Sequence, residues 1–228
     1  MFVLQKVFLG VGHGGSDPGA VGYVVEKVAN LEMAIACRDY LVSNNVDVLL
    51  SRTGDWGDSL ESRIKKCNNF KPNLAIDIHN NAGGGDGFEV YYHYKGGTSL
   101  DLAKNLEKEV KNIGQNSRGL KTKLNTHGTD YFGFIRETIC PAVIVEGFFV
   151  DNKEDSAIAD VAEEQRKFGV AYAKAILKTL GVKEKEIDTN ENLYYVQAGA
   201  FAVKANAEKL LDVLKQKGFN SAFIKQKI

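Results

Sequence analysis

The chain has 228 residues, enough for one sizeable hydrophobic core and a small appendage. Its 29 Lys and Arg residues balance 29 Asp and Glu residues, which argues against the basic stripe of a nucleic-acid-binding surface. The cysteines are odd in number and show no paired spacing, which argues against a disulfide framework; they are Cys37, Cys67 and Cys140.

The first nine residues read as a buried strand. They lack the basic start and small-residue cleavage site of a signal peptide, and their apolar run passes directly into Gly10. No stretch of the sequence has the length and apolar character needed to span a bilayer. We therefore expect synthesis in the cytoplasm without a signal peptide, and no membrane insertion.

Strand and helix patterns then alternate as far as residue 180. Short apolar runs predict strands at residues 7–11, 46–50, 74–78, 87–94 and 142–145. Apolar residues at helical spacing predict helices at residues 28–42, 60–67, 102–113 and 158–180. This alternation predicts an α/β fold, with a mainly parallel twisted sheet and helices on both faces. In such folds the chemistry gathers at the carboxyl ends of the strands.

The remaining residues predict a linker and a small second unit. Residues 181–193 are charged and weakly apolar, as in a linker, which leaves residues 1–180 as the main domain. A strand at 194–201, a helix around 207–214 and a strand at 219–224 would form a β-α-β unit within residues 194–228. A unit of this size seldom builds a stable core alone, so we expect it to dock, to self-associate, or to be half of a longer domain.

Three polar residues near predicted strand ends or glycine turns have the character of metal ligands. His13 lies between glycines after the first strand, Glu26 lies near the start of the following helix, and His79 ends a buried strand. Two histidines and a glutamate form the ligand set of many catalytic zinc sites, which keep one position open. Singly, each residue has a plainer interpretation, as a turn histidine, a solvated helix-start carboxylate or a core histidine.

Glu146 follows the apolar residues 143–145, where burial of an unpaired carboxylate is costly. It is therefore our candidate for a catalytic general base. We also consider Asn81, Arg63 and His127 as substrate-binding residues. A solvated surface position for Arg63 and an exposed loop position for His127 are the alternatives.

The motifs together resemble the zinc-dependent N-acetylmuramoyl-L-alanine amidases of the amidase-3 type, found in phage endolysins and bacterial autolysins. The resemblance implies that His13, Glu26 and His79 bind zinc, and that Glu146 is the catalytic carboxylate. Two departures from the family pattern are Val24-Val25 before Glu26, and Asp77 where serine is frequent. The motifs are Gly12-His13-Gly14-Gly15-Ser16-Asp17-Pro18-Gly19-Ala20, Glu26-Lys27 with Asn30, Ser51-Arg52-Thr53, His79-Asn80-Asn81-Ala82 and Pro141 to Phe148.

The tail, from Tyr194 to Phe201 and on through Ala222-Phe223-Ile224, is similar to the first half of a SPOR-type repeat. Such domains bind the glycan strands of peptidoglycan. The resemblances imply an enzyme that hydrolyses the amide between the lactyl group of N-acetylmuramic acid and L-alanine, and that lyses the cell wall after release. Alternatives are a zinc-dependent peptidase or deacetylase acting on another wall amide, and a non-catalytic wall-binding protein.

Overall fold

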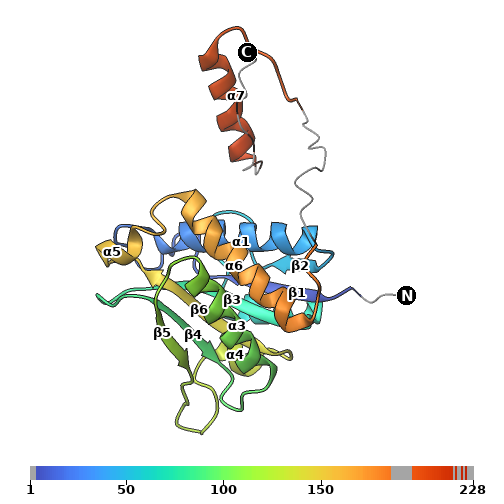
Figure 1. The fold of residues 1–228 in the computed structure, drawn as a ribbon, viewed down its shortest axis with the longest axis vertical. Coiled ribbons are helices and arrows are strands. Elements are labelled where there is room, and N and C mark those ends of the chain that lie inside the picture. The colour runs from blue at the N-terminus through green and yellow to red at the C-terminus, as the bar shows by residue number, and fades with distance from the viewer. Residues whose placement is uncertain (1–3, 186–196, 218, 220–221, 223, 225–228) are drawn as a thin grey trace. The chain divides into compact units, whose positions relative to one another are not determined.

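A computed structural model describes residues 4–185, 197–217, 219, 222 and 224 (Figure 1). The chain divides into two compact units, residues 1–185 and 186–228, and each is described by itself. Among the described residues, none of the helices has the length and apolar character required to cross a membrane.

The first unit is built on a six-stranded sheet with the strand order β2-β1-β3-β6-β4-β5. The strands are β1 (Lys6–Val11), β2 (Asp47–Leu50), β3 (Leu74–Asn81), β4 (Phe88–Tyr92), β5 (Ser117–Lys121) and β6 (Ala142–Phe149). Strands β2, β1, β3 and β6 are parallel, whereas β4 pairs antiparallel with β6. The predicted mainly parallel sheet is confirmed. Strand β4 reverses because the connection from β3, residues 82–87, is too short for a crossover helix.

Helices cover both faces of the sheet. On one face α1 and α3 pack against α6, and on the other α2 packs against α4 (Figure 1). The helices of this unit are α1 (Glu26–Ser43), α2 (Leu60–Phe70), α3 (Thr98–Asn112), α4 (Gly133–Glu137), α5 (Lys153–Ser156) and α6 (Ala162–Leu180). The sequence patterns did not predict β5, α4 or α5, whose apolar repeats are too short to stand out.

Strand alternation decides which face each site residue occupies. Ala142 and Ile144 of β6 and Ala75 of β3 lie in the hydrophobic cluster on the side of α2 and α4. Because side chains alternate with a period of two, His79 and Glu146 point to that same face at the carboxyl ends of their strands.

The second unit contains α7 (Lys204–Gln216), which confirms the helix predicted around residues 207–214. The predicted strands differ from the structure where it describes them, because residues 197–201, 219, 222 and 224 belong to no strand. A strand needs a hydrogen-bonded neighbour, and a single half-repeat supplies few candidates for one. The rest of those two predictions, and most of the predicted linker, lie outside the described residues.

Candidate metal centre and active site

A tight glycine loop carries His13 beyond the end of β1. The backbone of His13 adopts φ 60°, in the left-handed region that side chains other than glycine rarely occupy. The buried Arg52 anchors this loop, because its guanidinium donates hydrogen bonds to the carbonyl oxygens of Val11 and Gly12. Backbone strain of this kind, roughly 1–3 kcal/mol, persists where the surroundings fix the conformation, and it is common at functional sites.

The first residue of α1, Glu26, is 3% exposed, and its carboxylate lies among backbone donors. Oε2 accepts a hydrogen bond from the Ala20 amide at 2.8 Å, and Oε1 accepts one from the Asn80 amide at 3.1 Å. The helix start adds a favourable dipole for a negative charge. The two valines that precede Glu26, atypical for the family, leave its carboxylate pointing into the site.

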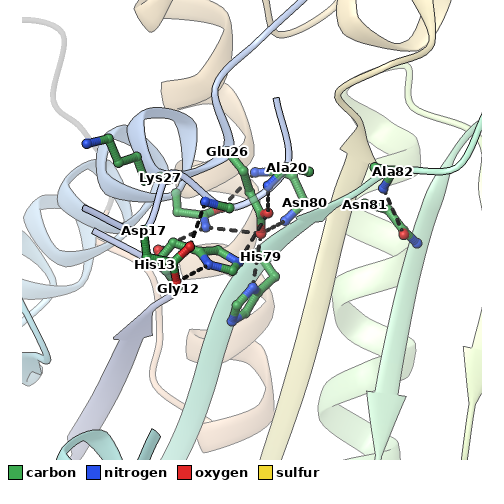
Figure 2. Close-up of polar contacts among 12 residues, drawn as sticks. Gly12, His13, Asp17, Ala20, Glu26, Lys27, His79, Asn80, Asn81 and Ala82 are labelled. Atoms are coloured by element: carbon green, nitrogen blue, oxygen red, sulfur yellow. Dashed lines mark hydrogen bonds and ion pairs between the residues drawn. The ribbon is translucent and has the colours of Figure 1, made fainter. Parts of the chain in front are cut away.

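Glu26 lies between the two histidines (Figure 2). His13 Nε2 is 3.2 Å from Glu26 Oε2, and His79 Nδ1 is 3.0 Å from Glu26 Oε1. One ligand-type atom from each of the three residues lies within 4.8 Å of the others. The histidine side chains keep 25% and 18% of their surface exposed, so the cluster is accessible from solvent.

An aspartate lies beside the far nitrogen of each imidazole, within hydrogen-bond distance for His13 and slightly beyond it for His79. His13 Nδ1 is 2.8 Å from Asp17 Oδ2, and His79 Nε2 is 3.6 Å from Asp77 Oδ2. Asp77 is itself fixed by Arg63, whose Nη1 lies 3.1 Å from Asp77 Oδ1. Metal-binding histidines commonly have such a carboxylate partner, which sets the tautomer and the ring orientation. The aspartate at position 77, unusual for the family, therefore has a direct partner in His79.

Electrostatics within the cluster favour charged groups. Burial opposes protonation of His79, but hydrogen bonds with Asp77 and Glu26 outweigh it and raise the pKa of His79 to about 10. Burial likewise opposes ionisation of Glu26, yet the two histidines hold the pKa of its carboxyl well below the usual range. A metal ion would take the place of the protons that these imidazoles carry.

Glu146 stands beside the cluster on the neighbouring strand. It is the register partner of His79 on β3 and of Glu89 on β4. Burial is the main reason that the pKa of Glu146 rises to about 7. A carboxylate with this pKa can exchange a proton near neutral pH, as a general base must.

The other predicted residues differ in their placement. Arg63 lies at the cluster, with its Nη1 3.5 Å from His79 Nε2. Asn81 ends β3 outside the cluster (Figure 2), and its amide is 3.4 Å from Glu89 Oε2. His127 is exposed in the loop after β5, which leaves the sheet at the end opposite to the cluster because β5 runs antiparallel to β6.

Sequence reasoning missed several supporting residues. Asp17 was foreseeable, because it lies four residues after His13 in the same glycine-rich loop. Glu89 was foreseeable only in part, since the alternation of the strand does not say which residue faces Glu146. Arg52 lies in the quoted motif Ser51-Arg52-Thr53, but its role at the His13 loop had no local signal, because the loop partners lie about 25 and 40 residues away in the chain.

The fold and the site define a class: an α/β enzyme with a candidate metal centre and a neighbouring carboxylate at the strand ends. Residues 7–178 match the family described as N-acetylmuramoyl-L-alanine amidase, and the chain belongs to that family. Residues 190–228 match the SPOR domain. The protein is thus an N-acetylmuramoyl-L-alanine amidase that hydrolyses peptidoglycan and acts on the cell wall.

Individual relatives agree with this family membership. The chain is 35% identical to the sporulation-specific N-acetylmuramoyl-L-alanine amidase of Bacillus subtilis, over 96% of this chain and 84% of the relative. It is 31% identical to an endolysin of Bacillus phage SPP1, over 79% of this chain and 68% of the relative. Among solved structures, the catalytic domain of the amidase CwlV from Bacillus (Paenibacillus) polymyxa var. colistinus superposes with TM-score 0.71 and 31% identity. That superposition covers 79% of this chain and all of the CwlV domain.

Proposed function

We propose that the cluster is a zinc site, with His13, Glu26 and His79 as its three protein ligands. The donor set fits a catalytic zinc, which takes three protein ligands and leaves one position open. Tetrahedral ligands about 2.0–2.1 Å from zinc lie about 3.3–3.4 Å from one another. The two imidazoles approach different oxygens of Glu26, at 3.2 Å for His13 and 3.0 Å for His79. With one ligand atom taken from each residue, the three atoms lie within 4.8 Å of one another, so a small adjustment of the side chains would bring them to that spacing. The single observation that carries the proposal is this convergence of three ligand atoms, with both far imidazole nitrogens facing carboxylates.

The proposed reaction needs a group that moves protons. Zinc, when bound, supplies a Lewis acid for the scissile carbonyl and lowers the pKa of a water molecule to about 7. Glu146 then accepts the proton of the attacking water and returns it to the leaving amine of L-alanine. Asp17 and Asp77 hold the imidazoles in orientation, so that each presents one nitrogen to the centre.

The role of Glu146 can be tested with Glu146→Gln, which keeps the shape of the side chain. We expect this variant to retain zinc and to lose about 10²–10⁴-fold in rate on peptidoglycan, the usual contribution of a general base. Glu61→Gln, on an exposed position of α2, is the matched control. Wall hydrolysis at the native rate by Glu146→Gln would contradict the assignment.

Product analysis tests the bond itself. Mass spectrometry of digested wall should show free stem peptides that begin with L-alanine, and chelation should abolish their release until zinc is restored. Products with L-alanine still attached to muramic acid would favour a peptidase, and free acetate would favour a deacetylase.

We also propose that the tail binds glycan strands, on the basis of the SPOR match. Phe201 is 46% exposed there, within the motif that resembles the family. In the inactive Glu146→Gln chain, Phe201→Ala should weaken sedimentation with insoluble peptidoglycan. Unchanged sedimentation would remove Phe201 from the binding surface.

A further inference from the structure

A row of charged side chains crosses the sheet from the candidate metal centre to its edge. His79 on β3, Glu146 on β6 and Glu89 on β4 are register partners on adjacent strands. The row ends on the edge strand β5 with Arg118 and Lys121, which both contact Glu89. One face of the sheet therefore presents the metal ligand, the proposed base and two cations in sequence.

A β-bulge brings both cations to this face. Residues three apart on a regular strand point to opposite faces, so Arg118 and Lys121 would be separated. The register between β4 and β5 shifts instead, from Phe88 opposite Ser117 to Val90 opposite Leu120. Gly119 within the shift has φ 93°, a conformation that glycine adopts without strain. Bulges of this kind redirect side chains and are frequent beside active sites.

The cations outnumber the carboxylate that they share. Glu89 is 3% exposed, and its Oε1 lies 2.5 Å from Arg118 Nε and 2.6 Å from Lys121 Nζ. Glu89 faces two positive charges, so these three side chains together carry one net positive charge beside the carboxyl group of Glu146. The side chains of Arg118 and Lys121 are 43% and 32% exposed, which makes that charge accessible to a ligand.

The geometry of Arg118 leaves donors free. Its Nε donates to Glu89, and its guanidinium lies 5.2 Å from the ring centre of Phe149, the last residue of β6. Within the part of the chain that the structure describes, its two terminal nitrogens have no protein partner. A guanidinium fixed at one edge, with its terminal N–H groups free, is suited to bind a carboxylate.

We propose that Arg118 and Lys121 bind a carboxylate of the stem peptide, and so determine which stem peptides are cleaved. This inference rests on the proposed function, which puts hydrolysis at the cluster with Glu146 as the base. Two strand spacings separate β6 from β5, about 10 Å. An extended peptide covers that distance in about three residues, at about 3.3 Å each. The carboxylate of the second or third stem residue would therefore reach the two cations.

Paired substrates test the proposal: muramoyl tripeptides that differ only in whether the stem carboxylates are free or amidated. For Arg118→Gln and for Lys121→Gln we expect kcat/KM to fall about tenfold on the free-acid substrate, the loss typical of a hydrogen bond to a charged group. On the amidated substrate kcat/KM should change less than about twofold, which also shows that the variants are folded. Lys123→Gln, beside the ring of Tyr131, is the matched control.

Three outcomes overturn the proposal. An equal loss on both substrates would show that the two cations only maintain the sheet edge and the position of Glu89. Native rates on the free-acid substrate would show that they do not bind it. Release of amine from neither substrate by the native chain would refute the proposed function itself, and the inference with it.

Discussion

Replacing Gly12 with alanine should impair the metal site and leave the fold intact. A Cβ at Gly12 would lie 2.3 Å from His79 Cε1 and 2.6 Å from both ring nitrogens. Gly12 does not have a positive φ, so the backbone itself accepts alanine. Carbon atoms at ordinary contact lie at least about 3.5 Å apart, so the imidazole must move by about 1 Å.

Such a displacement is several times larger than a metal site tolerates. Ligand distances hold to about 0.2 Å, and we therefore expect zinc affinity to fall by about 100-fold, the upper end for disturbed ligand orientation. A 100-fold loss corresponds to about 2.7 kcal/mol of ligand-linked stability. For a chain of this length each kcal/mol shifts Tm by about 2–4 °C, so the zinc-dependent rise in Tm should shrink by about 5–10 °C.

Calorimetric zinc titration and thermal unfolding with and without chelator measure both effects. Gly57→Ala is the matched control, because its added Cβ would meet no atom closer than 3.7 Å. Native zinc affinity in Gly12→Ala, with the full rise in Tm, would refute the reasoning that Gly12 makes room for the His79 ring.

Three further changes probe other parts of the molecule. Gly169→Ala should lower the free energy of unfolding by about 1–3 kcal/mol, as measured in denaturant, since its Cβ would lie 2.2 Å from the Met33 carbonyl oxygen between α6 and α1; unchanged stability would contradict that packing. Asp77→Asn should weaken zinc binding by about 10–100-fold in calorimetry, and equal affinity would show that Asp77 does not support His79. In the folded chain, burial raises the pKa of Glu146 from 4.5 to about 7. With zinc removed by a chelator, the folded state therefore binds a proton that the unfolded state has lost between pH 4.5 and about 7, and the free energy of unfolding falls as pH rises through that range. Glu146→Gln should remove this loss, so its free energy of unfolding should exceed that of the native chain at pH 8 and exceed it much less at pH 4. A difference in free energy of unfolding that does not vary with pH would contradict the raised pKa.

The sequence predicted the fold class and the residues at the strand ends because both depend on local patterns. Apolar runs alternating with helical repeats indicate a parallel sheet, and its topology gathers the carboxyl ends of the strands at one edge. His13, Glu26 and His79 each follow such a run or open such a helix, so their convergence followed from the pattern. The structure adds that their ligand atoms lie within 4.8 Å.

Partners distant in the chain could be found only in the tertiary structure. Arg52 closes the His13 loop from about 40 residues away, and Glu89 meets Arg118 from 29 residues away. Neither relation leaves a periodic trace in the sequence, whereas Asp77, two residues before His79 on one strand, follows from the strand period.

The edge strand shows the same division most clearly. Arg118 and Lys121 both face Glu89 because Gly119 has a positive φ and the register between β4 and β5 shifts by one residue. A regular strand with a period of two would put Arg118 and Lys121 on opposite faces of the sheet. The sequence by itself determined the α/β fold and the candidate ligand set, because these follow from apolar periodicity and residue type. The tertiary structure decided which charges meet, because hydrogen-bond register between strands is a property of the folded sheet.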